Sequence, residues 1–118
     1  MEIIISGRHL DISDDLRAYA EERLTRLGQE YAKLTIARLV MEMERSWHLA
    51  EVHVTGKSLD LEADARSRDM YTSIDEAVAK IEKQLRRHLD KVQAHHRGLS
   101  LADEEIEAAE LEEDEAIT

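Results

Sequence analysis

The stretch AEVHVTGKSLDLEADAR, residues 50–66, carries apolar residues at every second position on both sides of one glycine-containing segment. Period-two alternation is typical of a strand with one buried and one solvated face. A short glycine-containing segment between two such runs is typical of a hairpin turn, and here it is TGKS (55–58). The stretch therefore predicts two antiparallel strands joined around Gly56, in a sheet that is covered on one side.

Two more strands are expected before this hairpin. Residues 34–44 alternate less regularly and place Leu39, Met41 and Met43 on one face. The β-branched run within Glu2–Ser6 predicts a first strand, and Gly7 is expected to end it.

Two other segments follow a helical period. After Ser13, an N-cap candidate, apolar residues recur every three or four positions as far as Tyr31, and Gly28 is expected to cap or weaken the last turn. A second apolar seam runs from about Tyr71 to about His96 and contains Ile74, Val78, Ile81, Leu85, Leu89 and Val92. The element order β-α-β-β-β-α predicts an α+β fold, with a four-stranded, mostly antiparallel sheet and two helices packed on one face.

The 118 residues are enough for one domain with a modest core, which we assign to residues 1–97. Residues 98–118 carry nine acidic residues, no Lys or Arg and few apolar residues, so we expect a largely disordered acidic tail. The absence of cysteine excludes disulfides and Cys-based metal sites. We expect no secretory signal and no membrane span, hence a cytoplasmic protein without a membrane partner.

The formal net charge of −11 is unevenly distributed: it is −2 over residues 1–97 and +4 over residues 80–97. In helical projection, four cations fall within about 80° of arc on a flank about 130° from the apolar seam: Lys80, Lys83, Arg87 and Lys91. Arg86 lies beside them. This flank is expected to be exposed, with its cations about one helical turn apart, a scale that matches phosphate spacing in nucleic acids. It indicates either a site for RNA or another polyanion, or an ordinary solvated helix face.

Two segments resemble the family of ribosome hibernation promoting factor and ribosome-associated inhibitor A, bacterial proteins formerly called sigma-54 modulation proteins. They are ISGRHLDISDDLRAYAEERLTRL (5–27) and ARSRDMYTSIDEAVAKIEKQLRRHLDK (65–91), and the resemblance covers about residues 2–93. Its most specific parts are the DMY-x-x-I-D start and the K-x-x-[RK]-Q-L-x-[KR] continuation. The family's fold has the same element order and is similar to a double-stranded-RNA-binding domain.

The resemblance implies a protein that binds the small ribosomal subunit, through 16S rRNA and neighbouring ribosomal proteins, in the channel used by mRNA and tRNA. Occupying that channel would block translation and hold ribosomes inactive under stress or in stationary phase. The implied rRNA contacts are basic residues of both helices and the segments before them: Lys80, Lys83, Arg86, Arg87, Lys91, Arg66, Arg17, Arg23, Arg26 and Arg8. The signature residues Asp69, Met70 and Tyr71 also match, with a helix cap as the structural alternative for Asp69 and a core position for Tyr71. The chain is expected to lack the second domain of the long family form, and its acidic extension favours a short form that holds single ribosomes.

Other interpretations remain open. A protein-interaction module, in which the basic helix docks an acidic protein partner, would explain the same cations. We expect no enzyme activity, cofactor, metal site or small-molecule substrate, because no nucleophile–base pair, phosphate-binding glycine loop or H-E-x-x-H motif occurs. Trp47, in a hairpin connection, either stacks on a base or packs locally, and we prefer local packing.

Overall fold

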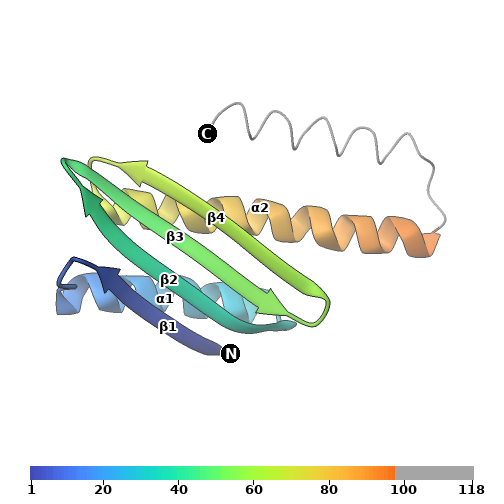
Figure 1. Ribbon diagram of the computed structural model, residues 1–118. Helices are drawn as coiled ribbons and strands as arrows, with labels where there is room; N and C mark the ends of the chain where they lie inside the picture. Colours follow the sequence, from blue (N-terminus) through green and yellow to red (C-terminus); the bar gives the residue numbers. More distant parts are fainter. Residues whose placement is uncertain (98–118) are drawn as a thin grey trace. The chain divides into compact units, whose positions relative to one another are not determined.

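The computed structural model describes the backbone of residues 1–97 and the side chains of residues 1–89 (Figure 1). The elements are β1 (Glu2–Arg8), α1 (Asp14–Glu30), β2 (Leu34–Glu44), β3 (Trp47–Gly56), β4 (Leu59–Ser67) and α2 (Met70–Arg97). The predicted order is confirmed, whereas the tail assigned to residues 98–118 lies outside the described residues. Two compact units divide the chain, Met1–Glu82 and Lys83–Thr118, so the boundary between them falls within α2. Neither helix described within residues 1–97 is long and apolar enough to cross a membrane.

The four strands form one sheet in the order β1-β2-β3-β4, which confirms the predicted mostly antiparallel sheet. β1 pairs with β2 in parallel, while β2 with β3 and β3 with β4 are antiparallel. The parallel pair needs a crossover connection, and α1 provides it. The antiparallel pairs are joined by short turns, as the alternating sequence predicts.

The core lies on one face of this sheet, which α1 and the first part of α2 (Met70–Glu82) cover (Figure 1). The described parts of both predicted helical seams and the predicted strand faces supply it, while the side chain of Val92 lies outside the described residues. Its buried residues in the first unit include Ala20, Leu24, Leu27, Leu39, Met41, Val52, Val54, Ile74, Val78 and Ile81. Each of the larger aliphatic side chains contributes about 1.5–3 kcal/mol when it is fully removed from water. The opposite face of the sheet carries the polar half of each alternating strand; within the first unit neither α1 nor Met70–Glu82 covers it (Figure 1), and we call it the uncovered sheet face.

Two glycines behave differently from the sequence prediction. Gly7 does not end β1, because the parallel ladder with β2 continues through Gly7 opposite Met41 and ends at Arg8. Gly28 does not cap α1, which continues to Glu30. A Cβ on Gly28 would lie only 2.6 Å from Cε of Met1, so glycine here makes room for the N-terminal side chain.

The turn between β3 and β4 lies where predicted, but the role of its glycine is different. The left-handed residue is Ser58, with φ of 62°. Gly56 is instead required by a close approach, because a Cβ there would lie 2.4 Å from the carbonyl oxygen of Lys33. This glycine lets the start of β2 pass directly beside the end of β3.

Side-chain hydrogen bonds fix the start of α2. A carboxylate oxygen of Asp69 accepts from the backbone N–H of Thr72 at 3.0 Å, which confirms the predicted cap. Ser73 is fully buried, and its hydroxyl donates to the carbonyl of His48 at 2.6 Å and lies 2.7 Å from the hydroxyl of Ser67. Because a buried hydroxyl without partners is costly, these bonds orient the first turn of α2 against β3 and β4.

Candidate nucleic-acid interface

The predicted cations of α2 are not equally accessible. Lys83 and Arg86 are exposed, and their i,i+3 spacing places their Cβ atoms about 5–6 Å apart. Lys80 is half-buried, and its ammonium donates to the backbone carbonyl of Asp64 at 2.8 Å. That bond uses one of the three N–H donors of the lysine, so the remaining donors are available to a second acceptor.

The structure contradicts one predicted exposure. Arg87 is only 8% exposed, although helical projection places it opposite the apolar seam. The prediction that Arg87 lies on an exposed flank is therefore wrong, because the position of the apolar seam alone does not determine how exposed a single side chain is. Lys91 belongs to α2, but its side chain lies outside the described residues.

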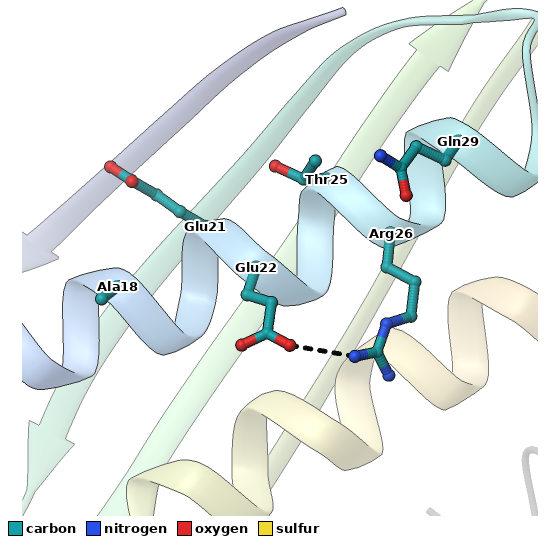
Figure 2. Close-up of a pocket in the computed structure, with 6 residues that line it drawn as sticks. All are labelled: Ala18, Glu21, Glu22, Thr25, Arg26 and Gln29. Carbon is teal, nitrogen blue, oxygen red and sulfur yellow. Dashed lines mark hydrogen bonds and ion pairs between the residues drawn. The ribbon is translucent and has the colours of Figure 1, made fainter.

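Three of the predicted arginines on β1 and α1 are exposed. Arg8 forms an ion pair with Glu42 at 3.2 Å, between β1 and β2, and Arg17 donates to the carbonyl of Ile5 at 3.4 Å. Arg26 reaches back along α1 to Glu22, with 2.9 Å between the guanidinium and the carboxylate (Figure 2). Exposed ion pairs of this kind contribute only about 0.2–1 kcal/mol, so a phosphate can replace the carboxylate.

The outward surface of α1 also has an open hollow, shown in Figure 2. It is lined by Ala18, Glu21, Glu22, Thr25, Arg26 and Gln29. All six residues come from one helix and include two carboxylates and one guanidinium, of which Glu22 points toward Arg26 and Glu21 points away (Figure 2). The hollow itself is therefore acidic and does not suit a phosphate.

The fourth arginine, Arg23, has a different environment. Its side chain is 20% exposed and its Nε lies 3.0 Å from a carboxylate oxygen of Asp75, with Glu82 at 3.9 Å. The same oxygen of Asp75 accepts the hydroxyl of Tyr19 at 2.6 Å. This bond, together with burial, raises the pKa of Tyr19. Arg23 thus takes part in a network that joins α1 to α2.

The signature residues have separate structural roles. Met70 is a core residue, 4% exposed. Tyr71 is 38% exposed, so the core alternative for this residue is wrong; its ring instead meets that of Tyr19 edge-on, 4.9 Å between centroids. Asp75 completes DMY-x-x-I-D, and sequence reasoning took it only as a family marker. Its bond partners are on a helix about fifty residues away in sequence, which no local pattern reveals.

One further basic cluster was only partly predicted. The guanidinium carbon of Arg68 lies 3.9 Å from the ring centroid of Trp47, and that of Arg66 lies 4.9 Å from it. We call these three residues the arginine–tryptophan stack. Arg66 was predicted as an rRNA contact, while Arg68 and Trp47 were not. The sequence does contain one indication for Arg68. Side chains two residues apart in an extended chain point to the same side, so Arg68 is expected to share a face with Arg66.

The middle of β3 and β4 is acidic on the uncovered sheet face, whereas Arg38 of β2 lies opposite His53. Glu51 lies opposite Asp64 in the β3–β4 ladder, and a side-chain hydrogen bond with Glu62 is the largest cause that raises the pKa of Glu51. His53 and Asp60 bond to each other on the same face. Among the described residues, no group of three or more His, Asp or Glu side chains is arranged to hold a metal ion. A polyanion would therefore be repelled from this central region.

Comparison with known proteins gives a consistent result. Residues 3–93 match the model of a family described as sigma 54 modulation protein / S30EA ribosomal protein. A ribosome hibernation promoting factor of Azotobacter vinelandii is 33% identical over 90% of this chain and 99% of its own length. Another of that name, from Escherichia coli K12, is 29% identical over 80% of this chain and its entire length.

Two solved structures are similar as well. A ribosomal subunit interface protein from Coxiella burnetii superposes with a TM-score of 0.72 at 26% identity, covering 76% of this chain and 99% of its own. The N-terminal domain of Protein Y from Thermus thermophilus gives a TM-score of 0.67 at 31% identity, covering 75% of this chain and 99% of its own. The predicted fold is thus confirmed by structures as well as by element order.

Proposed function

This chain belongs to the sigma 54 modulation protein / S30EA ribosomal protein family, and on that premise we propose that it is a ribosome-associated translation inhibitor that holds ribosomes inactive. The observation that carries the proposal is the family match over residues 3–93. Relatives named ribosome hibernation promoting factor support it, since they align over nearly their whole length. The alternative, a module whose basic helix docks an acidic protein, is not favoured, because these relatives and the solved neighbour from Coxiella burnetii are named for ribosomes.

The mechanism that we propose is steric. The domain would occupy the channel of the small subunit through which mRNA and tRNA pass, so that neither can enter. Such a mechanism needs shape and charge but no catalytic residue. Because each phosphate neutralised on RNA releases counterions, the affinity should fall as salt rises.

The proposed rRNA contacts are the accessible members of the predicted set. Lys83 and Arg86 are the best supported, because both are exposed. A second group of residues bonds to a backbone carbonyl or a carboxylate but keeps further N–H donors for RNA: Lys80, Arg8, Arg17 and Arg26. Arg66 belongs to the arginine–tryptophan stack. Arg23 and Arg87 are less accessible, and we assign them mainly structural roles.

Sedimentation with purified ribosomal subunits tests this function. The unmodified chain should pellet with small subunits and not with large subunits, and should compete with mRNA binding. The double variant Lys83→Glu/Arg86→Glu should lose most of this binding. The matched control is Lys33→Glu/Lys57→Glu, which changes the charge equally at two exposed positions outside the predicted set.

The outcomes separate the function from the residues. If the unmodified chain does not pellet with small subunits at moderate salt, the proposed function is wrong. If it does, but the variant at Lys83 and Arg86 binds as well as the control variant, the function stands and the assigned residues are wrong. Circular dichroism of each variant checks that the fold is intact.

We also propose that residues 1–97 form the ribosome-binding domain and that the tail reduces binding to unrelated RNA. Residues 98–118 carry nine acidic residues and no Lys or Arg, so they repel phosphate. Removing them should raise the affinity for random RNA more than the affinity for ribosomes. An unchanged ratio of the two affinities would count against this role.

A further inference from the structure

The arginine–tryptophan stack lies at one end of the uncovered sheet face. Trp47 begins β3 directly after the turn at Arg45 and Ser46. In the β3–β4 ladder His48 lies opposite Ser67 and Leu49 opposite Arg66. Residues directly opposite in an antiparallel pair point to the same face, and Ala50 and Ala65, the next pair, are buried in the core. Alternation therefore places Trp47, Arg66 and Arg68 together on the face opposite α1 and Met70–Glu82.

The ring holds both guanidinium groups at stacking distance. Cation–π contacts extend to about 6 Å from the ring centroid, and both arginines lie within that range. A guanidinium that stacks with its plane on a ring still directs its N–H groups outward along its edges. Arg68 uses one N–H to donate to the hydroxyl of Ser46. Each arginine has five such donors, so most of them remain for a ligand.

Carboxylates lie near the stack, since Glu44 is opposite Trp47 in the β2–β3 ladder and Asp64 lies two residues before Arg66 on β4, but the described ion pairs do not join them to the two arginines. Among the described ion pairs, none joins Arg66 or Arg68 to a carboxylate, whereas Glu42, on the neighbouring strand, pairs with Arg8. Asp69, the residue after Arg68, accepts the hydrogen bonds that cap α2. Both arginine side chains are exposed. The stack thus presents two exposed cations that no described ion pair neutralises directly.

From these observations we infer that the arginine–tryptophan stack binds the phosphodiester backbone of RNA, with Arg66 and Arg68 as the binding residues and Trp47 as the positioning residue. The inference rests on the proposed function and adds a binding region at the β2–β3 turn to the one proposed at Lys83 and Arg86. Guanidinium groups suit phosphate because two parallel N–H bonds match two phosphate oxygens. Stacking restricts the long side chains before binding, which lowers the entropy cost when a phosphate is bound. Because a guanidinium already lies on the ring, RNA meets the arginine edges and does not stack a base on Trp47.

Ribosome sedimentation at several salt concentrations tests the two arginines. Arg66→Gln/Arg68→Gln should weaken binding about tenfold, since it removes two groups that form charge-assisted hydrogen bonds. It should also reduce the slope of log affinity against log salt by about 0.7–0.9 for each phosphate that is no longer neutralised. Lys33→Gln/Lys57→Gln removes the same charge at the opposite end of the sheet and should leave both quantities near those of the unmodified chain. Arg66→Lys/Arg68→Lys keeps the charge and should weaken binding with little change in slope, because lysine lacks the planar fork.

Substitutions of the ring test its positioning role. Trp47→Leu removes the stacking surface but no charge, so binding should weaken severalfold while the salt slope is nearly unchanged. Trp47→Phe restores an aromatic face and should recover much of the affinity. If Trp47→Leu binds like the unmodified chain, Trp47 has no positioning role and this part of the inference is overturned.

Tryptophan fluorescence reports directly on the stack, because Trp47 is the only tryptophan of the chain. Titration with a single-stranded oligoribonucleotide at low salt should change the Trp47 fluorescence of the unmodified chain and of the Lys33/Lys57 control. The change should be absent in Arg66→Gln/Arg68→Gln. If this variant matches the control in both assays while the unmodified chain still pellets with small subunits, the inference fails and the proposed function stands. If the unmodified chain does not pellet with small subunits, the proposed function and this inference both fail.

Discussion

Asp75 accepts two hydrogen bonds that join α1 to α2, and weakening them should measurably destabilise the domain. The informative changes are Tyr19→Phe, which removes one donor, and Asp75→Asn, which keeps the acceptor oxygen but removes its charge. The hydroxyl of Tyr19 and Nε of Arg23 lie 2.6 and 3.0 Å from the same carboxylate oxygen. Both substitutions preserve side-chain shape, so the change in hydrogen bonding dominates the effect.

The expected size follows from the environment. A hydrogen bond to a charged group contributes about 1.5–3 kcal/mol to the free energy of unfolding. The side chain of Asp75 is 47% exposed, so water competes and the lower end applies. We expect losses of about 1–1.5 kcal/mol for Tyr19→Phe and about 1–2 kcal/mol for Asp75→Asn. The double variant should lose less than the two effects added together, by about 0.5–1 kcal/mol, because both changes weaken one bond.

The pH dependence gives an independent check. The pKa of Tyr19 is raised above 10.0, first by its hydrogen bond to Asp75 and then by burial. A raised pKa means that the folded state favours the protonated tyrosine. The resulting stability is complete below about pH 10 and is lost as the pH rises through the pKa of the folded state. Tyr19→Phe should lack this alkaline loss.

The assay is urea unfolding at pH 7, followed by far-UV circular dichroism, with the dependence on urea concentration compared between variants. Glu76→Gln is the matched control, because it removes an exposed carboxylate from the adjacent position of α2; it should change the free energy of unfolding by less than about 0.5 kcal/mol. The reasoning is refuted if Asp75→Asn is no more destabilising than this control. Strict additivity of Tyr19→Phe and Asp75→Asn would equally show that the two side chains are not coupled.

Three further predictions concern stability. Ser73→Ala should lower the free energy of unfolding by about 1–3 kcal/mol, because it removes a buried hydroxyl and leaves its partly buried partners without this bond; a loss below about 0.5 kcal/mol in urea unfolding would contradict this. Gly56→Ala should lower the free energy of unfolding by about 1–3 kcal/mol, because its Cβ would overpack against the backbone. Ser58→Gly should be neutral or raise it by up to about 1 kcal/mol, because it relieves a positive φ. Equal effects of the two variants in thermal unfolding would exclude this explanation. The pKa of Glu51 is raised, first by its hydrogen bond with Glu62. The stability that protonated Glu51 contributes to the fold is therefore present below pH 4.5 and is lost as the pH rises through the folded-state pKa. The stability gained by Glu51→Gln, relative to the unmodified chain, should therefore be larger at pH 7 than at pH 4, and the reverse order would refute the assigned cause.

Much of the fold could be predicted because local patterns determine it. Alternation in the strands and the three-to-four spacing in the helices specify which face of each element is buried, and the buried residues follow those patterns. The cap at Ser13 was also predictable, since its hydroxyl accepts from the N–H of Leu16 at 3.2 Å, within one turn of chain. The roles of Gly7 and Gly28 were not, because they depend on a neighbouring strand and on the side chain of Met1.

The candidate site was predictable in outline only. Sequence reasoning found the cations of α2, but it could not tell which of them are accessible, and Arg87 shows the limit of a helical projection. It also could not find the pairings made by Asp75 or the contact between Trp47 and Arg68, because these join residues that are distant in sequence. Tertiary pairing thus decides which of the matching basic residues can reach a ligand.

The edge formed by β4 has a consequence for how the protein behaves at high concentration. An edge strand exposes unpaired backbone groups and is a template on which another chain can add a strand. Here Asp60, Glu62 and Asp64 project from alternate positions of β4, and all are exposed. In addition, the ammonium of Lys80 occupies the carbonyl of Asp64. An approaching second copy would meet a row of like charges and an occupied acceptor, so the edge resists aggregation while the helices and turns remain free to bind.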